Sequence, residues 1–230
     1  MASDKRELLE KYNRQREEVI NRLLDEGVEF TDITGVTISP EAKFGKNVVI
    51  HRGTIIKGET VIGDNCEIGP DTILEECKVE NNTKILMCVC EKSTIGSGVT
   101  MGPYSHLRPN STICDNVHIG NFCEVKNSVV GEGTKAGHLT YIGDTDCGKN
   151  VNFGCGVVVA NYDGKNKHRT VIGDDCFIGS NTNLVAPVTL GNASLTAAGS
   201  TVTDEVPDGA MAIARARQVN KENWKERKKK

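Results

Sequence analysis

Aromatic side chains are scarce in this chain, where Phe, Trp and Tyr together make up only 4% of the 230 residues. With so few aromatic residues and 24 glycines, the interior must be built from small and branched aliphatic side chains, which suits a narrow, regular core. No apolar run approaches the roughly 20 residues that a membrane-spanning helix needs, so we expect no membrane contact. The net charge is only −3, which gives no electrostatic basis for binding nucleic acid.

The N-terminal segment also lacks the apolar stretch of a secretory signal, because residues 1–18 are charged throughout. The nine cysteines are an odd number, and without an export signal a complete disulfide framework is not expected. We therefore expect a cytoplasmic protein whose cysteines are mostly small buried residues. Cys88 and Cys90 form the single close pair, and no histidine-rich partner lies at zinc spacing, so no metal site is predicted.

Apolar residues recur at every sixth position through most of the chain. The series includes Ile50, Ile56 and Ile62, and it is found again over residues 95–159 and 172–202. A small residue follows most of these apolar residues four positions later. An α-helix would need a period of 3.6, so the pattern excludes a helix here. A six-residue period fits short strands that turn a corner at every repeat, with three strands per coil and the coils stacked as a solenoid.

The repeats divide the chain into an N-terminal arm, a solenoid domain and a tail. Residues 1–35 are expected to form a helical arm, with a helix over residues 4–27 that covers the open first coil. Residues 36–207 are predicted to form the all-β solenoid, with about nine or ten coils. Residues 208–230 are expected to form a polar, frayed tail.

Two segments interrupt the six-residue period. The spacing is lost between Glu75 and Ser93, which predicts a break in the coil. Between Ala160 and Val171 the chain leaves the repeat with the sequence NYDGKNKH. Function concentrates in such excursions from a regular scaffold.

Stacking of the coils places residues about 18 apart on neighbouring coils, or about 17 apart where one step has five residues. Arg108 and Lys126 are 18 apart, and each immediately follows an inward-facing apolar residue, so the two cations are expected to stack at roughly 5 Å. Two cations this close repel unless an anion lies between them, and phosphate is the natural ligand. The alternative is a solvated pair of surface charges.

A second column contains Asn121, His138 and Cys155, which are 17 residues apart. If the excursion simply interrupts one coil, Ser180 and Ala198 continue the same corner. His138 then stands at one end of a row of small side chains about 14 Å long, comparable to a pantetheine arm. This position suits a base beside a bound thioester, and the alternative is an exposed turn histidine.

Six motifs resemble one transferase family. They are GPYSHLRP (102–109), IGNFCEVK (119–126), KAGHLTYIGD (135–144), NVNFGCG (150–156), NYDGK (161–165) and IGSNTNLVAPV (178–188). Together they are similar to the acetyltransferase half of the bifunctional bacterial glucosamine-1-phosphate N-acetyltransferase / N-acetylglucosamine-1-phosphate uridyltransferase. The resemblance covers nearly the whole chain and is strongest from Ile95 to Lys221.

The resemblance implies a left-handed parallel β-helix with an N-terminal α-helix, and acetyl transfer from acetyl-CoA to the amino group of glucosamine 1-phosphate, a step toward UDP-N-acetylglucosamine. It implies that His138 is the general base and that Glu124 orients it. The sugar-phosphate ligands correspond to Arg108, Lys126, Tyr141, Asn152 and Lys167. The acetyl-CoA contacts correspond to Cys155, Asn161, Tyr162, Ser180, Ala198 and Arg215.

The sequence departs from the family in two respects. Cys155 stands where the family usually has alanine, which invites a covalent reading, although no sequence feature marks it as an activated thiolate. The uridyltransferase half of the family is not represented, so we expect acetyl transfer only, with a separate uridyltransferase protein for the following step. Family members are trimers that bind acetyl-CoA between adjacent β-helices, and the resemblance therefore implies a homotrimer.

Three other functions are compatible with hexapeptide repeats. The first is an acyltransferase for another amino sugar or acyl donor, and the second is a non-catalytic trimeric scaffold that binds sugar nucleotides. The third is a metal-dependent hydratase like the γ-type carbonic anhydrases. For the third, His106 and His118 are 12 residues apart, which places them on different faces of one coil.

Overall fold

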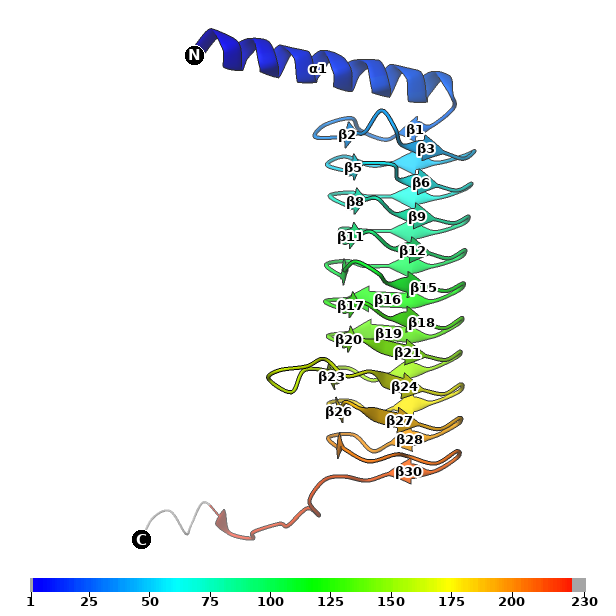
Figure 1. Cartoon of the computed structure of the whole chain (residues 1–230), viewed down its shortest axis with the longest axis vertical. Helices are drawn as coiled ribbons and strands as arrows, with labels where there is room; N and C mark the ends of the chain where they lie inside the picture. The colour runs from blue at the N-terminus through cyan, green and yellow to red at the C-terminus, as the bar shows by residue number, and fades with distance from the viewer. Residues whose placement is uncertain (1, 225–230) are drawn as a thin grey trace.

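Short parallel strands wind around a narrow core and stack into a column, with one helix across the first coil (Figure 1). This computed structural model describes residues 2–224, so residues 225–230 of the predicted tail lie outside the described residues. Helix α1 spans Ala2–Asp25, and the chain then visits three sheets in turn on every coil. The β-solenoid predicted from the six-residue period, with its N-terminal helix, is confirmed.

Three parallel sheets form the faces of the column, and strands pair with their counterparts on neighbouring coils. The first sheet contains β1 (Glu29–Phe30), β4 (Val49–Ile50), β7 (Glu67–Ile68), β10 (Lys84–Ile85), β13 (Thr100–Met101), β16 (His118–Asn121), β19 (Lys135–His138), β22 (Asn152–Phe153), β25 (Phe177–Ile178), β28 (Leu195–Thr196) and β30 (Met211–Ala212). The second contains β2 (Thr37–Ile38), β5 (Ile55–Lys57), β8 (Ile73–Glu75), β11 (Val89–Glu91), β14 (His106–Leu107), β17 (Glu124–Lys126), β20 (Tyr141–Gly143), β23 (Val158–Ala160), β26 (Asn183–Val185) and β29 (Thr201–Val202). The third contains β3 (Lys43–Phe44), β6 (Val61–Ile62), β9 (Lys78–Val79), β12 (Thr94–Ile95), β15 (Thr112–Ile113), β18 (Val129–Val130), β21 (Thr145–Cys147), β24 (Thr170–Ile172) and β27 (Val188–Leu190).

The repeating apolar residues fill the inside of the column. Ile50, Ile56 and Ile62 are at most 1% exposed, and each belongs to a different sheet. The small residue four positions later also faces inward, where a threonine hydroxyl can bond to the backbone at a corner. The Thr60 hydroxyl, for example, donates to the carbonyl of Lys57 at 2.8 Å. Cysteine fills the same slot at Cys66, which is buried and donates to the carbonyl of Glu80 at 3.0 Å.

The column extends beyond the range 36–207 that the repeats mark. At the N-terminal side β1 joins the first sheet, and the amide of Glu29 donates to the carbonyl of Val48 at 2.9 Å. At the C-terminal side β30 joins the same sheet, where the amide of Leu195 donates to the carbonyl of Ala210 at 2.9 Å. Because edge strands need only two paired residues to join the sheet, they carry too little of the repeat to be seen in the sequence.

The break expected between Glu75 and Ser93 is wrong. Strands β9, β10 and β11 continue the three sheets without interruption. The step between inward residues shortens to five from Leu74 to Val79 and again after Ile85, as the printed sequence shows. A corner can lose one residue while the next strand still faces inward, so the coil survives although the period does not.

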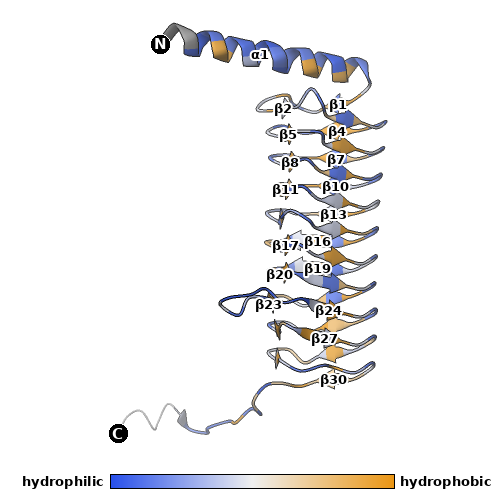
Figure 2. Ribbon diagram, viewed as in Figure 1, coloured by the Kyte–Doolittle hydropathy of each residue, from blue (hydrophilic) through white to orange (hydrophobic). Residues whose placement is uncertain are grey.

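Helix α1 covers the open first coil, as its apolar residues predicted (Figure 1). Val19 and Leu23 are buried in the core cluster of the column. The Arg16 guanidinium donates to the backbone carbonyls of Ile33 and Val36, which ties the helix to the first coil. Figure 2 shows the rest of the helix as mostly hydrophilic, with isolated hydrophobic turns, and no helix within residues 2–224 is long and apolar enough to span a lipid bilayer.

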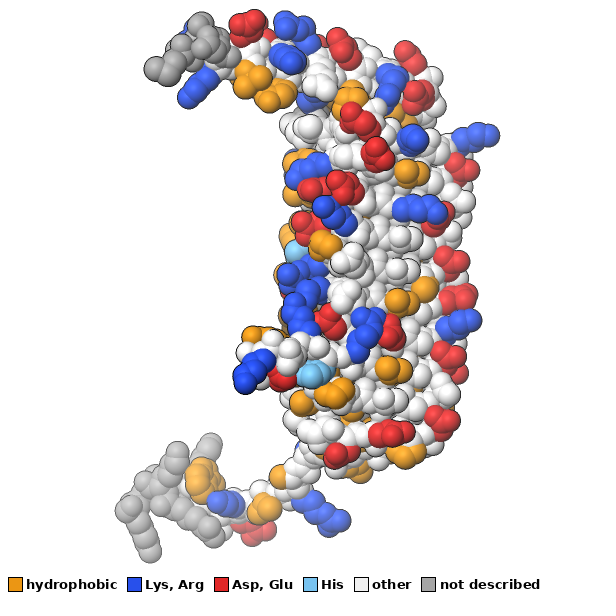
Figure 3. Space-filling model, in the orientation of Figure 1, with side chains coloured by type: hydrophobic (Ala, Val, Ile, Leu, Met, Phe, Trp, Pro, Cys, Tyr) orange, Lys and Arg blue, Asp and Glu red, His pale blue; other side chains and the backbone are white. Residues whose placement is uncertain are grey.

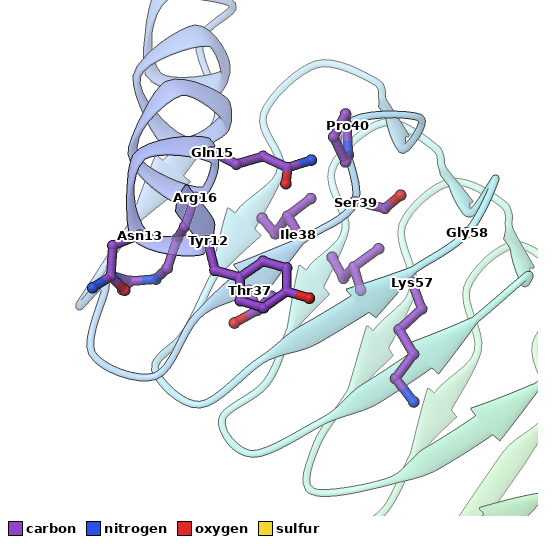
Figure 4. Close-up of a pocket in the computed structure, with 11 residues that line it drawn as sticks. Tyr12, Asn13, Gln15, Arg16, Thr37, Ile38, Ser39, Pro40, Lys57 and Gly58 are labelled. Atoms are coloured by element: carbon purple, nitrogen blue, oxygen red, sulfur yellow. The ribbon is translucent and has the colours of Figure 1, made fainter. Parts of the chain in front are cut away.

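A cavity of about 410 Å³ lies between α1 and the first coils (Figure 4). Tyr12 and Arg16 of the helix line one side, and Thr37, Ile38 and Lys57 line the other. It belongs to the junction between the cap and the column, several coils away from the residues that the motifs single out.

Candidate active site

Three cations gather on the second sheet beside the excursion loop (residues 161–169). Leu107 of β14 pairs with Val125 of β17, and the amide of Arg108 donates to the carbonyl of Val125 at 2.8 Å, so Arg108 lies one coil before Lys126. Lys167 comes from the loop. The three side chains line a cavity of about 370 Å³ together with Asp144. Figure 3 shows Lys and Arg side chains gathered on this edge of the column, directly above the protruding loop.

The cations are close enough to perturb one another. The Lys167 amine lies within hydrogen-bonding reach of Lys126 and lowers the pKa of Lys126, and partial burial and the charge of Arg108 act in the same direction. Asp144 opposes this effect, because its carboxylate lies 3.7 Å from the Lys126 amine. One carboxylate does not balance three cations, so an anion such as a phosphate group would relieve the remaining repulsion.

Asp144 is a structural part of this cluster that the sequence patterns did not reveal. Its carboxylate is almost fully buried and accepts hydrogen bonds from Asn127 at 2.5 Å and from Asn161. Burial acts to raise the pKa of Asp144, but these two hydrogen bonds and the charge of Lys126 outweigh it and lower the pKa. A signal was present, since Asn127, Asp144 and Asn161 follow the same 17-residue spacing as the histidine column.

The acetyl-CoA contact implied for Asn161 differs from what its side chain does here. The amide of Asn161 is buried and committed to Asp144, which places it on the cation side of the site. Tyr162, next along the loop, is exposed, and its hydroxyl donates to the carbonyl of Gly164 at 2.7 Å. Of this pair, only Tyr162 presents a side chain to an external ligand.

His138 lies at the end of β19 in the first sheet, at the corner that leads into β20. Its side chain is exposed, and its Nδ1 lies 2.7 Å from Oδ1 of Asn121 on the preceding coil. Tyr141 begins β20 just past the corner. An ideal Cβ on Gly143 would lie 2.5 Å from the Tyr141 hydroxyl, so the glycine leaves room for the tyrosine ring on the outer face of this strand.

The resemblance implied that Glu124 orients His138, and the contacts in this chain differ. The Glu124 carboxylate accepts a hydrogen bond from Arg108 at 2.9 Å, and this bond raises the pKa of Arg108. Glu124 opens β17 in the second sheet and pairs with Tyr141, whereas His138 pairs with Asn121 in the first sheet. The corner between the two sheets therefore separates the carboxylate from the imidazole.

A row of small side chains leads away from His138 along the same corner. Strand pairing aligns Ala136 with Phe153, Phe153 with Ile178, and Ile178 with Thr196. The residues two positions further on form what we call the small-residue edge, namely Cys155, Ser180 and Ala198.

The small-residue edge ends beside a cation. The Cδ atom of Arg215 lies 3.8 Å from the position that a Cβ on Gly199 would occupy, which places Arg215 next to Ala198. Asn152, in contrast, lies in β22 of the first sheet and pairs with Lys135. The structure therefore does not bring Asn152 together with Arg108 and Lys126 on the second sheet.

The excursion loop is organised by Asp163. One carboxylate oxygen accepts from the amides of Lys165 and Asn166, both at 2.7 Å, and the other pairs with His168 Nε2 at 2.7 Å. The amide of Asn166, the His168 side chain and the amide of Lys165 together hold the pKa of Asp163 well below its usual range. Because the folded pKa is depressed, the stabilisation is present above the unfolded pKa and is lost as the pH falls toward the folded one.

We expect Asp163→Ala to loosen the loop, because the variant loses all three hydrogen bonds. The amides of Lys165 and Asn166 should exchange with solvent about fivefold faster, which hydrogen-exchange mass spectrometry measures. Asp163→Asn should give a smaller increase, since its amide oxygen still accepts from both backbone amides. Asp175→Asn, on the first-to-third-sheet side of a lower coil, is the control, and equal exchange in all variants would contradict this role of Asp163.

The histidines considered for a metal-dependent hydratase are engaged elsewhere. His106 Nε2 lies 2.9 Å from Glu91 in the second sheet, and His118 Nδ1 lies 2.8 Å from Thr100 in the first sheet. Within residues 2–224, no three His, Cys, Asp or Glu side chains converge as metal ligands. The chemistry that the described site can perform is therefore that of a base, a cation cluster and a narrow edge.

The chain is similar to known bacterial proteins over almost its full length. The sequence profile described as bacterial transferase hexapeptide (six repeats) matches residues 41–76, 92–127 and 169–204. The Bifunctional protein GlmU of Geobacillus sp. (strain WCH70) is 51% identical over 226 residues, which are 98% of this chain and 49% of that protein. The Bifunctional protein GlmU of Caldicellulosiruptor saccharolyticus is 53% identical over 206 residues, which are 90% of this chain and 44% of that protein. The chain thus spans about half the length of the curated relatives it matches.

Solved structures of other acyltransferases are more distant. The UDP-N-acetylglucosamine acyltransferase of Arabidopsis has a TM-score of 0.44 and 15% identity, covering 77% of this chain and 69% of that one. At this level the fold rests on the strand pairing described above.

Proposed function

We propose, on the premise that this chain belongs to the bacterial transferase hexapeptide family, that it transfers an acetyl group from acetyl-CoA to the amine of glucosamine 1-phosphate. The observation that carries the proposal is the position of two groups on either side of β20. His138 lies just before this strand, and Lys126 pairs with Gly143 at its end. A sugar that lies along the outer face of β20 would present its phosphate to the cations and its amine to the imidazole.

His138 would act as the general base. The amine nitrogen attacks the carbonyl carbon of the thioester, a C–N bond forms, and His138 accepts the proton that the nitrogen loses. When the tetrahedral intermediate collapses, the C–S bond breaks, and the imidazolium returns the proton to the leaving sulfur. The products are an N-acetyl sugar phosphate and free CoA, and the histidine ends in its starting state.

The small-residue edge would hold the pantetheine arm of acetyl-CoA. Ser180 and Ala198 leave a narrow surface beside the corner, and a chain that lies along it would place its thioester at His138. Arg215 at the far end supplies a positive charge for a CoA phosphate. Neither a different amino-sugar substrate nor a non-catalytic scaffold is favoured by the relatives, which are about half identical to this chain.

The active form would be a homotrimer, and one exposed corner supports this. Tyr104, Phe122 and Leu139 occupy the same corner on three consecutive coils and are each more than half exposed. All three have a positive φ, which is costly for bulky side chains and needs a compensating interaction. The rings of Tyr104 and Phe122 stack with centroids 5.5 Å apart. This apolar corner adjoins His138, so a second copy packed against it would form the other wall of the acetyl-CoA groove.

We expect the double substitution Tyr104→Asp and Phe122→Asp to dissociate the oligomer, because two carboxylates would have to be buried without partners. Light scattering after size-exclusion chromatography should show one third of the wild-type mass. Val129→Asp is the control, since Val129 is also a partly exposed apolar residue but lies in the third sheet. A double variant that keeps the wild-type mass would contradict the proposed interface.

The proposed activity is tested by release of the CoA thiol from acetyl-CoA in the presence of glucosamine 1-phosphate. We expect one thiol per N-acetyl product, and much less release with glucosamine, which lacks the phosphate. Release that is independent of the phosphate would contradict the role of the cation cluster. If no amino-sugar phosphate supports thiol release, the proposed function is wrong and a binding scaffold becomes the better explanation.

A further inference from the structure

Asn121 and His138 are held against each other by the tightest strand pair of the first sheet. Strands β16 and β19 are the longest pair there, and Asn121 lies opposite His138 in their register. An ideal Cβ on Gly120 would lie 1.9 Å from the carbonyl oxygen of Gly137, so the backbones approach more closely than any side chain at residue 120 would allow. The amide of Leu139 also donates to the carbonyl of Asn121 at 3.0 Å.

The side-chain contact sets the hydrogen position on the imidazole. His138 Nδ1 lies 2.7 Å from Asn121 Oδ1. An amide oxygen can only accept a hydrogen bond, so the ring nitrogen that faces it must carry the hydrogen. In the neutral ring the lone pair is then on Nε2, at the other side of the imidazole.

We propose that Asn121 is a positioning residue that fixes His138 as the Nδ1–H tautomer and orients Nε2 toward the substrate amine. The inference rests on the proposed function, and it assigns to Asn121 the role that the resemblance implied for Glu124. The Glu124 carboxylate is engaged by Arg108, whereas Asn121 is the hydrogen-bond partner of the ring. In the transfer step Asn121 exchanges no proton, because the amine proton passes to Nε2 and from there to the CoA sulfur.

The tautomer is measured on the full-length protein labelled with ¹⁵N-histidine, without any substrate. In the wild type we expect the His138 signals of an Nδ1–H tautomer, and in Asn121→Ala a mixture of the two tautomers. Thr100→Ala is a matched control, because Thr100 contacts His118 Nδ1 at 2.8 Å in the same sheet. This variant should change the His118 signals and leave those of His138 unchanged.

Kinetics separates positioning from a merely structural role. Asn121→Ala should lower kcat about 10- to 100-fold, which is part of the contribution of a general base, with little change in either KM. Asn121→Asp retains an acceptor but adds a negative charge that favours the imidazolium. The acid limb of its pH profile should therefore move to higher pH by about one unit, with activity recovered at alkaline pH. A structural defect would lower activity equally at every pH.

Two results would overturn the proposal. One is a His138 tautomer that is the same in the wild type and in Asn121→Ala. The other is a pH profile of Asn121→Asp that coincides with that of the wild type. Failure of the proposed function has a different signature, because a locked tautomer in a wild-type protein that releases no CoA would refute acetyl transfer, and with it the catalytic use of the lock.

Discussion

His138→Ala should abolish acetyl transfer while the protein stays folded and oligomeric. The variant removes the group that accepts the amine proton, and a general base contributes about 10²- to 10⁴-fold to the rate. The fold should survive because the side chain is exposed and its hydrogen bond to Asn121 lies on the surface of the column. Turnover is measured by thiol release, and folding by circular dichroism and the oligomeric mass.

The matched control is His118→Ala. His118 also lies on the outer face of the first sheet and also uses Nδ1 to contact a residue of the preceding coil, which is Thr100. It is remote from β20, so its loss should leave kcat within about twofold of the wild type. Turnover of His138→Ala at the wild-type rate would refute the assignment of the base, whatever the control shows.

Much of the column follows from residue spacing because each coil has fixed inward positions. Once Leu107 and Val125 face inward, Arg108 and Lys126 have to lie on adjacent coils, and the strand pairing shows this register. The same reasoning aligned Asn121 with His138 before any contact between them was known. Spacing of 17 or 18 residues therefore predicts which residues are stacked.

Spacing does not predict which side chains bond to each other. Glu124 was expected to orient His138, yet it lies across a corner and its carboxylate pairs with Arg108. Such contacts depend on side-chain rotamers and on which sheet each residue faces. The coil between Glu75 and Ser93 was missed for another reason, since two neighbouring corners each lack one residue. The left hand of the solenoid came from the family resemblance, because a period carries no information on handedness.

Arg108→Ala should raise KM for glucosamine 1-phosphate about 10- to 100-fold and change KM for acetyl-CoA much less. The guanidinium is one of the three cations that line the cavity, and a charge-assisted hydrogen bond to phosphate is worth about 1.5–3 kcal/mol. The variant also leaves the Glu124 carboxylate without its cation, which adds repulsion toward a phosphate group. Initial rates with each substrate varied in turn give the two KM values.

Glu124→Gln separates the two roles that Glu124 has been assigned. If the carboxylate only competes with phosphate for Arg108, its removal should lower KM for the sugar phosphate and leave kcat unchanged. If it orients the base, kcat should fall instead, as for a lost positioning group. Lys57→Ala is the control for loss of a cation, because Lys57 pairs with Glu75 on the same sheet but several coils away. An Arg108→Ala variant that raises both KM values equally would place the phosphate elsewhere, since a cation that binds the phosphate must discriminate between the sugar and the thioester.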